Sequence, residues 1–308
     1  MASLLFLAPA DLGETVLASG ALAYVLREGD ALTLIASAEA ALLFRAAPGL
    51  RATHVLAPGV AARWTLWLKL TGQRFDTVLD ARGGFLGLTA PADRRVALEP
   101  PEVLRHRVED WTETLGAQRA LAPKLWIDAK ARERAAELAP DSTPLLVLAP
   151  GGVTEDKRWP QERFAAVARR LAGGPLANAR IAVLGAASRD AEITRGIVSS
   201  LDADGVAAID LGQGPDLLAA AALMERATLC IGNDNALTHI AAAAGAPTLT
   251  LFGPTDERVR APYGPRARTL RGKSLEQISA QPDLDAGAAM GDVSTDAVEA
   301  AALDLMQD

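Results

Sequence analysis

Short apolar runs alternate along the chain with longer segments in which apolar residues recur at helical spacing. Strands are predicted over residues 3–9, 31–37, 52–58, 75–80, 94–98, 144–152, 179–186, 206–212, 227–234 and 246–256. Helices are predicted over residues 13–29, 38–49, 61–72, 105–117, 160–174 and 294–308, with others between the later strands. Most of these strands, above all those of the second half, are near-continuous apolar runs rather than alternating ones. They therefore favour parallel α/β sheets that helices cover on both faces.

The alternating pattern restarts in the second half of the chain. Proline and small polar residues at 137–144 interrupt a helix and mark a junction, and a length of 308 residues suits two domains. We expect two doubly wound parallel-sheet domains that face each other, over residues 1–140 and 141–290. Residues 280–292 read as a loop before the last helix.

Composition narrows the class of protein. A net charge of −7 argues against nucleic acid held by general basicity. The single cysteine, Cys230, excludes an intrachain disulfide, and its apolar strand predicts a buried, inert thiol. The first residues lack the basic start of a signal peptide, and their apolar run is too short to span a bilayer. We expect a cytoplasmic protein, and contact with a membrane surface stays open.

Residues 231–256 carry the densest group of polar side chains next to an apolar run. If a helix begins near Asp234 or Asn235, its first amides have no partner within the helix and favour an anion such as phosphate. Helical spacing puts Asn235 and His239 on one face. A capped core helix with a satisfied histidine is an equally good interpretation of this stretch taken alone.

Two further turns follow predicted strands. In residues 148–164 a glycine pair precedes Lys157 and Arg158, which suits an anion site but equally a surface loop balanced by acidic neighbours. In residues 9–22, Asp11 and Glu14 lie where open α/β sheets place ligands. A carboxylate there can act as a general base, or both acids can simply favour the helix dipole.

These stretches together resemble glycosyltransferase family 9, whose best-known members are ADP-heptose:lipopolysaccharide heptosyltransferases. "DLGETVLASGAL" is similar to the family's "SLGDVVLxLPxL", and "FDTVLDARGG" to "YDLVIDLQG". "PGGVTEDKRWPQERFAAVARRL" resembles "PGAxxxxKRWPxexFaxLa". "DNALTHIAAAAGAPTLTLFGPTD" is close to "DTGLxHLAAALGxPTxxLFGPTD". "HRVEDWTETLGA" and "MGDVSTDAVEAAALDLM" also have counterparts in the family.

The resemblance implies the GT-B fold, which is α/β with two Rossmann-like domains and a cleft between them. It implies that the first domain binds an acceptor sugar, that the second binds a nucleotide-sugar such as ADP-heptose, and that residues 291–308 pack back on the first domain. The implied enzyme is an inverting glycosyltransferase of cell-envelope polysaccharide or lipopolysaccharide synthesis. It needs no metal or other cofactor, and its partners are a nucleotide-sugar donor and a saccharide or lipid-linked acceptor.

The resemblance also assigns residues. Glu14 takes the place of the catalytic aspartate. The implied donor site comprises Thr154, Lys157, Glu192, Asp234, Asn235, Ala236, Leu237 and His239. The implied acceptor site comprises Asp11, Gly13 and Arg82.

The chain departs from the family pattern at Glu14, where an aspartate is usual, and at Asn235-Ala236, where threonine and glycine are usual. Two alternatives therefore stay open: a non-catalytic binder of nucleotide-sugars, and a GT-B nucleotide-sugar epimerase or hydrolase.

Trp64 and Trp67 lie three residues apart beside Arg63 and Lys69. We favour a helix that packs on its own sheet there, with peripheral contact to the inner membrane as the alternative.

Overall fold

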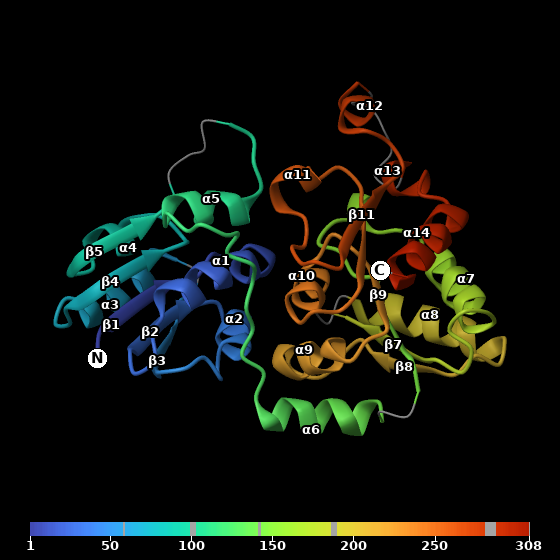
Figure 1. Ribbon diagram of the computed structural model, residues 1–308, viewed down its shortest axis with the longest axis horizontal. Coiled ribbons are helices and arrows are strands. Elements are labelled where there is room, and N and C mark those ends of the chain that lie inside the picture. Colours follow the sequence, from blue (N-terminus) through green and yellow to red (C-terminus); the bar gives the residue numbers. More distant parts are fainter. Residues whose placement is uncertain (58, 99–102, 141–142, 186–189, 281–287, 308) are drawn as a thin grey trace. The chain divides into compact units, whose positions relative to one another are not determined.

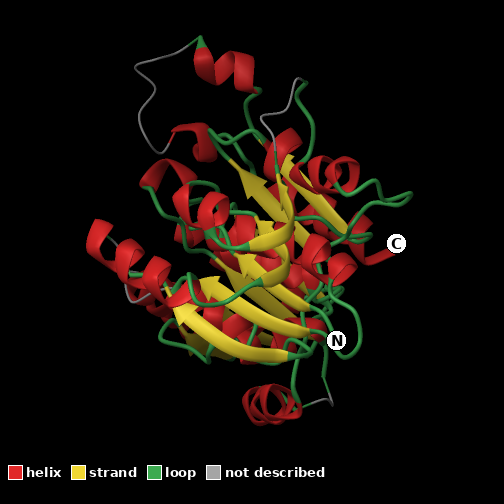
Figure 2. Ribbon diagram, turned by 90° about the vertical axis from the view of Figure 1, so that its left-hand side faces the viewer, coloured by secondary structure: helices red, strands yellow, loops and turns green. Residues whose placement is uncertain are grey.

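The structure is a computed structural model, and it describes residues 1–57, 59–98, 103–140, 143–185, 190–280 and 288–307. They form two compact units. The first comprises Met1–Asp128 and Arg258–Arg260, and the second comprises Ala129–Glu257 and Ala261–Asp308. Each unit holds one sheet with helices packed around it (Figures 1 and 2).

The first unit has a five-stranded parallel sheet in the order β3-β2-β1-β4-β5. Its strands are β1 (Ser3–Leu7), β2 (Ala31–Ala36), β3 (Leu50–Val55), β4 (Phe75–Asp80) and β5 (Ala92–Ala97). Its helices are α1 (Leu12–Val25), α2 (Ala38–Leu43), α3 (Val60–Leu70), α4 (Phe85–Thr89) and α5 (Arg107–Thr114).

Strand β1 shows why this sheet is covered on both faces. Successive side chains of a strand point to opposite faces. Leu5 and Leu7 pack in one apolar cluster with Leu66 of α3 and residues of α4. Phe6 points the other way and meets Phe44, just after α2, edge to face with ring centroids 6.0 Å apart. Helices therefore bury apolar side chains on each side, as the unbroken apolar runs predicted.

The second unit has a six-stranded parallel sheet in the order β11-β10-β9-β6-β7-β8. Its strands are β6 (Leu145–Ala149), β7 (Arg180–Leu184), β8 (Ala208–Leu211), β9 (Leu229–Asn233), β10 (Thr248–Phe252) and β11 (Ala267–Arg271). Its helices include α6 (Ala129–Leu138), α7 (Gln161–Ala172), α8 (Ala191–Ala203), α9 (Leu217–Glu225), α10 (Ala236–Ala243), α12 (Leu275–Ser279), α13 (Ala288–Gly291) and α14 (Thr295–Gln307). A 3-10 helix, η1 (Glu155–Lys157), precedes α7, and α11 (Glu257–Arg260) runs from this unit into residues grouped with the first.

The last helix, α14, belongs to the core of the second unit. Val298, Ala302 and Leu305 are buried in one cluster with residues of β6, β9 and α7. This differs from our expectation that residues 291–308 pack on the first unit. The reason is the spacing of these three side chains, which forms an apolar stripe that the sheet of its own unit covers.

The boundary between the units also differs from the expected 140/141, because α6 is grouped with the second unit. It contacts α9, and its Ala131 and Ala135 are buried. Helix α4 and strand β11 were not predicted, and α1 ends at Val25 rather than at Gly29. Of the loop expected at 280–292, residues 281–287 lie outside the described residues, and α13 follows them.

Burial of Cys230 is confirmed. It lies within β9 with no exposed surface, and this burial raises the pKa of its thiol to about 12. Such a thiol stays protonated and unreactive at neutral pH. Within the described ranges, no helix is long and apolar enough to cross a membrane.

Each sheet reverses its strand order at one place, and that place positions the candidate site. In the first unit the reversal falls between β1 and β4, and in the second it falls between β6 and β9. Ligands of open α/β sheets bind just beyond the carboxyl ends of the strands at such a point. The polar stretches identified in the sequence follow β1, β4, β6 and β9.

Candidate functional site

The second unit brings the glycine-pair loop and the start of α10 together. Strands β6 and β9 are neighbours, with Ala149 paired to Gly232 in register, so the segments that follow them leave the sheet side by side. Gly232 itself allows this closeness, since an added Cβ would lie 2.6 Å from Thr238 Cγ2 and 2.8 Å from the Cβ of Ala149. Parallel pairing thus joins two motifs that are about eighty residues apart in the chain.

Lys157 and Asp234 form an ion pair across these two segments. Lys157 Nζ, at the end of η1, lies 3.0 Å from Asp234 Oδ2, which precedes α10. The Asp234 side chain is 7% exposed and that of Lys157 is 25% exposed, so the ammonium remains reachable from solvent. A cation held beside a helix start is a suitable partner for a diphosphate.

Two asparagine side chains tie the loop after β6 to the loop after β9. Asn235 Nδ2 donates to the carbonyl oxygens of Ala149 and Gly151, both at 2.9 Å. Asn233 Nδ2 donates to Pro150 O at 2.6 Å, and Asn233 Oδ1 accepts from the Trp159 amide at 3.2 Å. The backbone around the Lys157–Asp234 pair is therefore fixed from both sides.

Asn235 also caps α10, as the capped-helix interpretation of this stretch predicted. Its Oδ1 accepts from the amides of Leu237 at 2.8 Å and Thr238 at 3.3 Å. The Asp234 amide donates to Leu251 O. Two of the four amides expected to bind diphosphate, those of Asp234 and Leu237, are thus already engaged. The anion site expected at 234–237 stays a prediction, with the amide of Asp234 bonded to Leu251 O and that of Leu237 bonded to Asn235 Oδ1.

The other expected donor residues take different positions in this unit. Ala236 is the first residue of α10 and is partly exposed, whereas Leu237 and His239 are buried. Thr154 is exposed and precedes η1, and Glu192 is exposed in the first turn of α8.

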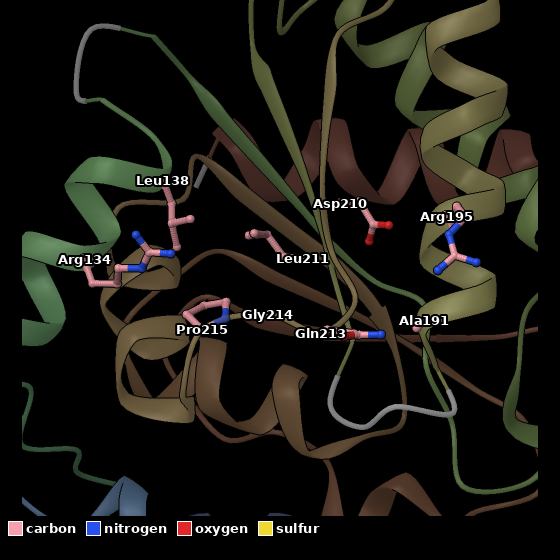
Figure 3. A pocket seen from close by; sticks show the side chains of 9 residues that line it. All are labelled: Arg134, Leu138, Ala191, Arg195, Asp210, Leu211, Gln213, Gly214 and Pro215. Atoms are coloured by element: carbon pink, nitrogen blue, oxygen red, sulfur yellow. The ribbon is translucent and has the colours of Figure 1, made fainter.

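A separate cavity of about 370 Å³ lies between α6, α8 and the end of β8. Figure 3 shows Arg134 and Arg195 approaching it from α6 and α8, with Asp210 between them. Ala191 also lines the cavity, directly before Glu192. Asp210 Oδ1 accepts from the Gly212 amide at 2.9 Å. The cavity thus offers a carboxylate and two guanidinium groups beside apolar walls, and its polar lining was not identified from the sequence.

In the first unit, the two acids of the β1–α1 turn, Asp11 and Glu14, have different partners. Asp11 is the N-cap of α1, and its Oδ1 accepts from the Glu14 amide at 2.9 Å. Gly13 is buried in the first turn. The Glu14 side chain is 18% exposed, and its Oε2 lies 3.2 Å from Nε of Arg107 on α5. Asp11 thus serves the helix, while Glu14 presents a carboxylate held by a guanidinium.

Arg107 and Asp80 lie beside the expected site residues, and neither was singled out from the sequence. Arg107 bridges Glu14 and Asp110, with Nη1 3.1 Å from Asp110 Oδ2. The sequence shows that Arg107 and Asp110 share one helix, but it does not show that they lie near Glu14. Asp80 ends β4 beside the end of β1, and its Oδ1 accepts from the amides of Arg82 and Gly83. Burial raises the pKa of Asp80 despite these hydrogen bonds.

Arg82 joins the two central strands of the first unit. Its Nη1 donates to Ala8 O at 3.4 Å, just beyond β1. Burial lowers its pKa, and the charge of Arg63 nearby lowers it further. The residues expected to bind an acceptor, Asp11, Gly13 and Arg82, therefore lie at the carboxyl ends of β1 and β4 with Glu14. Among the described residues, no group of three or more His, Cys, Asp or Glu side chains is placed to hold a metal ion.

The two Rossmann-like parallel sheets, each with polar side chains at its switch point, define a protein of the GT-B class. The chain belongs to glycosyltransferase family 9 (heptosyltransferase), whose family model matches residues 87–292. The family suspected from the sequence motifs and the expected fold class are both confirmed. The matched range includes Lys157 and Asp234, whereas Glu14 precedes it.

Two curated relatives align with parts of the chain. Lipopolysaccharide heptosyltransferase 2 of Salmonella typhimurium is 28% identical over 130 residues, which are 42% of this chain and 36% of that protein. Lipopolysaccharide heptosyltransferase 1 of Escherichia coli is 27% identical over 128 residues, 41% of this chain and 37% of that protein. The aligned part thus spans little more than a third of either relative.

Solved structures match almost the whole chain. E. coli ADP-heptose lipopolysaccharide heptosyltransferase II has a TM-score of 0.79 at 18% identity, covering 99% of this chain and 98% of that one. The family 9 glycosyltransferase of Veillonella parvula has a TM-score of 0.78 at 18% identity, covering 99% and 97%. At such identities the similarity supports the fold.

Proposed function

We propose that this protein is an inverting glycosyltransferase that moves a heptose-like sugar from a nucleoside diphosphate donor to a lipopolysaccharide or related cell-envelope acceptor. The observation that carries the proposal is the Lys157–Asp234 pair at the switch point of the second unit, 3.0 Å apart and tied in place by Asn235. Membership of family 9 supports the donor class, because the relatives are named as heptosyltransferases. A related structure of E. coli WaaC is described with ADP.

The proposed reaction is a direct displacement. Glu14 takes the proton of the acceptor hydroxyl, the hydroxyl oxygen bonds to the anomeric carbon, and the bond from that carbon to the diphosphate oxygen breaks. Lys157 and the amide of Ala236 stabilise the charge that develops on the departing diphosphate. Arg107 holds the Glu14 carboxylate in one orientation through its contact at 3.2 Å. Arg82, Asp11 and Gly13 line the acceptor side.

We place the nucleoside of the donor in the cavity between α6 and α8. Arg134 and Arg195 can lie against the faces of a base, and the Asp210 carboxylate can accept from an exocyclic amine. Glu192, next to Ala191 of the cavity wall, is then suited to a ribose hydroxyl. This arrangement favours a base with an exocyclic amine, such as adenine, over uracil, which has no such donor.

We further propose that transfer needs no metal ion or other cofactor, and that the enzyme works in the cytoplasm on a saccharide or lipid-linked acceptor. Turnover that survives excess EDTA would support the first point. Turnover that EDTA abolishes and Mg²⁺ restores would contradict it.

The decisive experiment compares Glu14→Gln with Glu14→Asp, the residue usual in the family. Binding of ADP is followed by thermal shift, since a ligand raises apparent stability by mass action. Transfer is followed with ADP-heptose and a heptose-acceptor lipopolysaccharide core. We expect the glutamine variant to bind ADP normally but lose transfer by about a thousandfold, and the aspartate variant to retain measurable transfer.

Turnover retained in Glu14→Gln would overturn the role of Glu14 as base. Consumption of the donor without acceptor would instead favour a hydrolase or epimerase. Binding without turnover across a panel of donors and acceptors would favour a non-catalytic nucleotide-sugar binder. The departures from the family pattern at Glu14, Asn235 and Ala236 are the features that support this alternative.

A further inference from the structure

Helix α3 has two apolar faces, and the sheet covers one of them. Leu66 and Leu70 are buried in the cluster that packs on β1. Val60, Trp64 and Leu68 recur every fourth residue on another face of the helix, with exposed fractions of 68%, 52% and 64%. Helix packing within the unit therefore explains the first face and leaves the second in contact with solvent.

Helix α4 extends this second face. Phe85 is 42% exposed and Leu88 is 73% exposed. The ring of Phe85 lies 5.2 Å from that of Trp64 and 5.9 Å from that of Trp67, measured between centroids. Figure 1 labels both helices in the first unit. We call their exposed apolar residues the α3–α4 patch: Val60, Trp64, Leu68, Phe85 and Leu88. Contiguous exposed apolar side chains of this kind mark interaction surfaces.

Helices α3 and α4 themselves carry basic and no acidic side chains, although the buried Asp80 lies against Gly87 of α4. The chain carries a net charge of −7, yet residues 59–75 and 81–92 contain no acidic side chain. Arg63 and Lys69 are exposed on α3. Arg63 also lies near enough to Arg82, which follows β4, to lower its pKa. An apolar face with aromatic residues and a basic border is complementary to anionic lipid headgroups above an acyl layer.

A protein partner is a poorer match to the same features. A stable interface buries about 800 Å² on each partner, whereas five partly exposed side chains on two short helices offer on the order of a few hundred Å². Tryptophan, by contrast, favours the boundary between headgroups and acyl chains, where its ring is apolar and its N–H meets water. Shallow insertion into a bilayer requires no partner of matching shape.

We propose that the α3–α4 patch is a membrane-docking surface that inserts into an anionic bilayer. The choice of a bilayer rests in one respect on the proposed function, because a lipid-linked acceptor is presented at such a surface. Trp64, Leu68, Phe85 and Leu88 enter the headgroup–acyl boundary, and Arg63 and Lys69 contact the phosphates.

The test is sedimentation with sucrose-loaded vesicles, without donor or acceptor. One set of vesicles contains phosphatidylethanolamine and phosphatidylglycerol, and the other contains phosphatidylcholine alone. The wild-type chain should bind the anionic vesicles and lose binding in high salt. Trp64→Ser combined with Leu68→Ser should weaken binding about tenfold or more, as should Arg63→Glu combined with Lys69→Glu. Leu42→Ser, which alters an exposed leucine on α2, is the matched control and should bind as wild type.

Several outcomes would overturn the inference. Wild-type protein that stays in the supernatant, or Trp64/Leu68 and Arg63/Lys69 variants that bind as wild type, would contradict docking through this patch. Self-association that the Trp64/Leu68 substitutions abolish would assign the patch to a second copy of the chain. Thermal unfolding shows whether each variant is folded. Because no transfer is measured, failure here leaves the transferase proposal intact, and failure of the Glu14 experiment leaves this test intact.

Discussion

Lys157 and Asp234 are in contact, with Nζ 3.0 Å from Oδ2, although 77 positions separate them in the chain. The pair joins the loop after β6 to the start of α10. On the proposed function, loss of the ammonium removes a positive charge from the diphosphate site, and it leaves the Asp234 carboxylate buried without that partner.

Lys157→Met should therefore weaken binding of ADP by about ten- to a hundredfold, the range of one charge-assisted hydrogen bond. Isothermal titration calorimetry measures this. Lys124→Met removes the same charge at an exposed position of the first unit and should bind ADP as wild type. Equal affinity of wild type and Lys157→Met would remove Lys157 from the donor site.

Asn235 combines a cap with a tie between loops, and two variants separate these roles. Asn235→Ala loses both and should lower the free energy of unfolding by about 2 kcal/mol. Asn235→Thr, the residue usual in the family, keeps a capping oxygen but loses the bonds to Ala149 and Gly151, so about half that loss is expected. Urea unfolding provides the values. If the threonine variant is as unstable as the alanine variant, the loop bonds rather than the cap stabilise the site.

In the proposed mechanism, Arg107 acts through Glu14, which it contacts at 3.2 Å, rather than on the reacting atoms. Arg107→Met should lower kcat by about tenfold or more while leaving the affinity for ADP unchanged, because Glu14 loses its fixed orientation. Steady-state kinetics with separate donor titrations tests this split. The exposed Arg119, changed to methionine, controls for loss of a positive charge. A change confined to ADP affinity would place Arg107 in the wrong role.

Asp80 gives a dependence of stability on pH with a definite sign. Burial raises the pKa of Asp80 in the folded state, so the carboxyl ionises first in the unfolded chain. Its contribution to stability is full below the unfolded pKa of about 3.9 and is lost as pH rises through the folded pKa. Asp80→Asn cannot ionise and keeps an oxygen for the amides of Arg82 and Gly83.

The stability of Asp80→Asn relative to wild type should therefore rise between pH 3.5 and pH 7. Urea unfolding at both pH values gives this difference, with the exposed Asp202→Asn as control. A difference that stays constant, or falls as pH rises, would mean that Asp80 is not penalised by burial.

Much of the fold could be predicted because its signals are local. Unbroken apolar runs identified the strands that are buried on both faces, and glycine, proline and polar residues marked most turns. The motifs around Lys157 and Asp234 were long enough to identify the family, which the family model confirms. Short elements with weak signals, such as α4 and β11, were missed because few residues carry their pattern.

Apolar runs and motifs in the chain were enough to predict the sheet class, the family and the polar residues that follow β1, β4, β6 and β9. Which of those residues meet depends on how the chain folds. Strand pairing brought Lys157 to Asp234, and helix packing brought Arg107 to Glu14. In the folded chain Asn235 caps α10, so the amides of Leu237 and Thr238 are engaged. Such contacts depend on the order and register of strands that are distant in the chain, and no local sequence pattern encodes these.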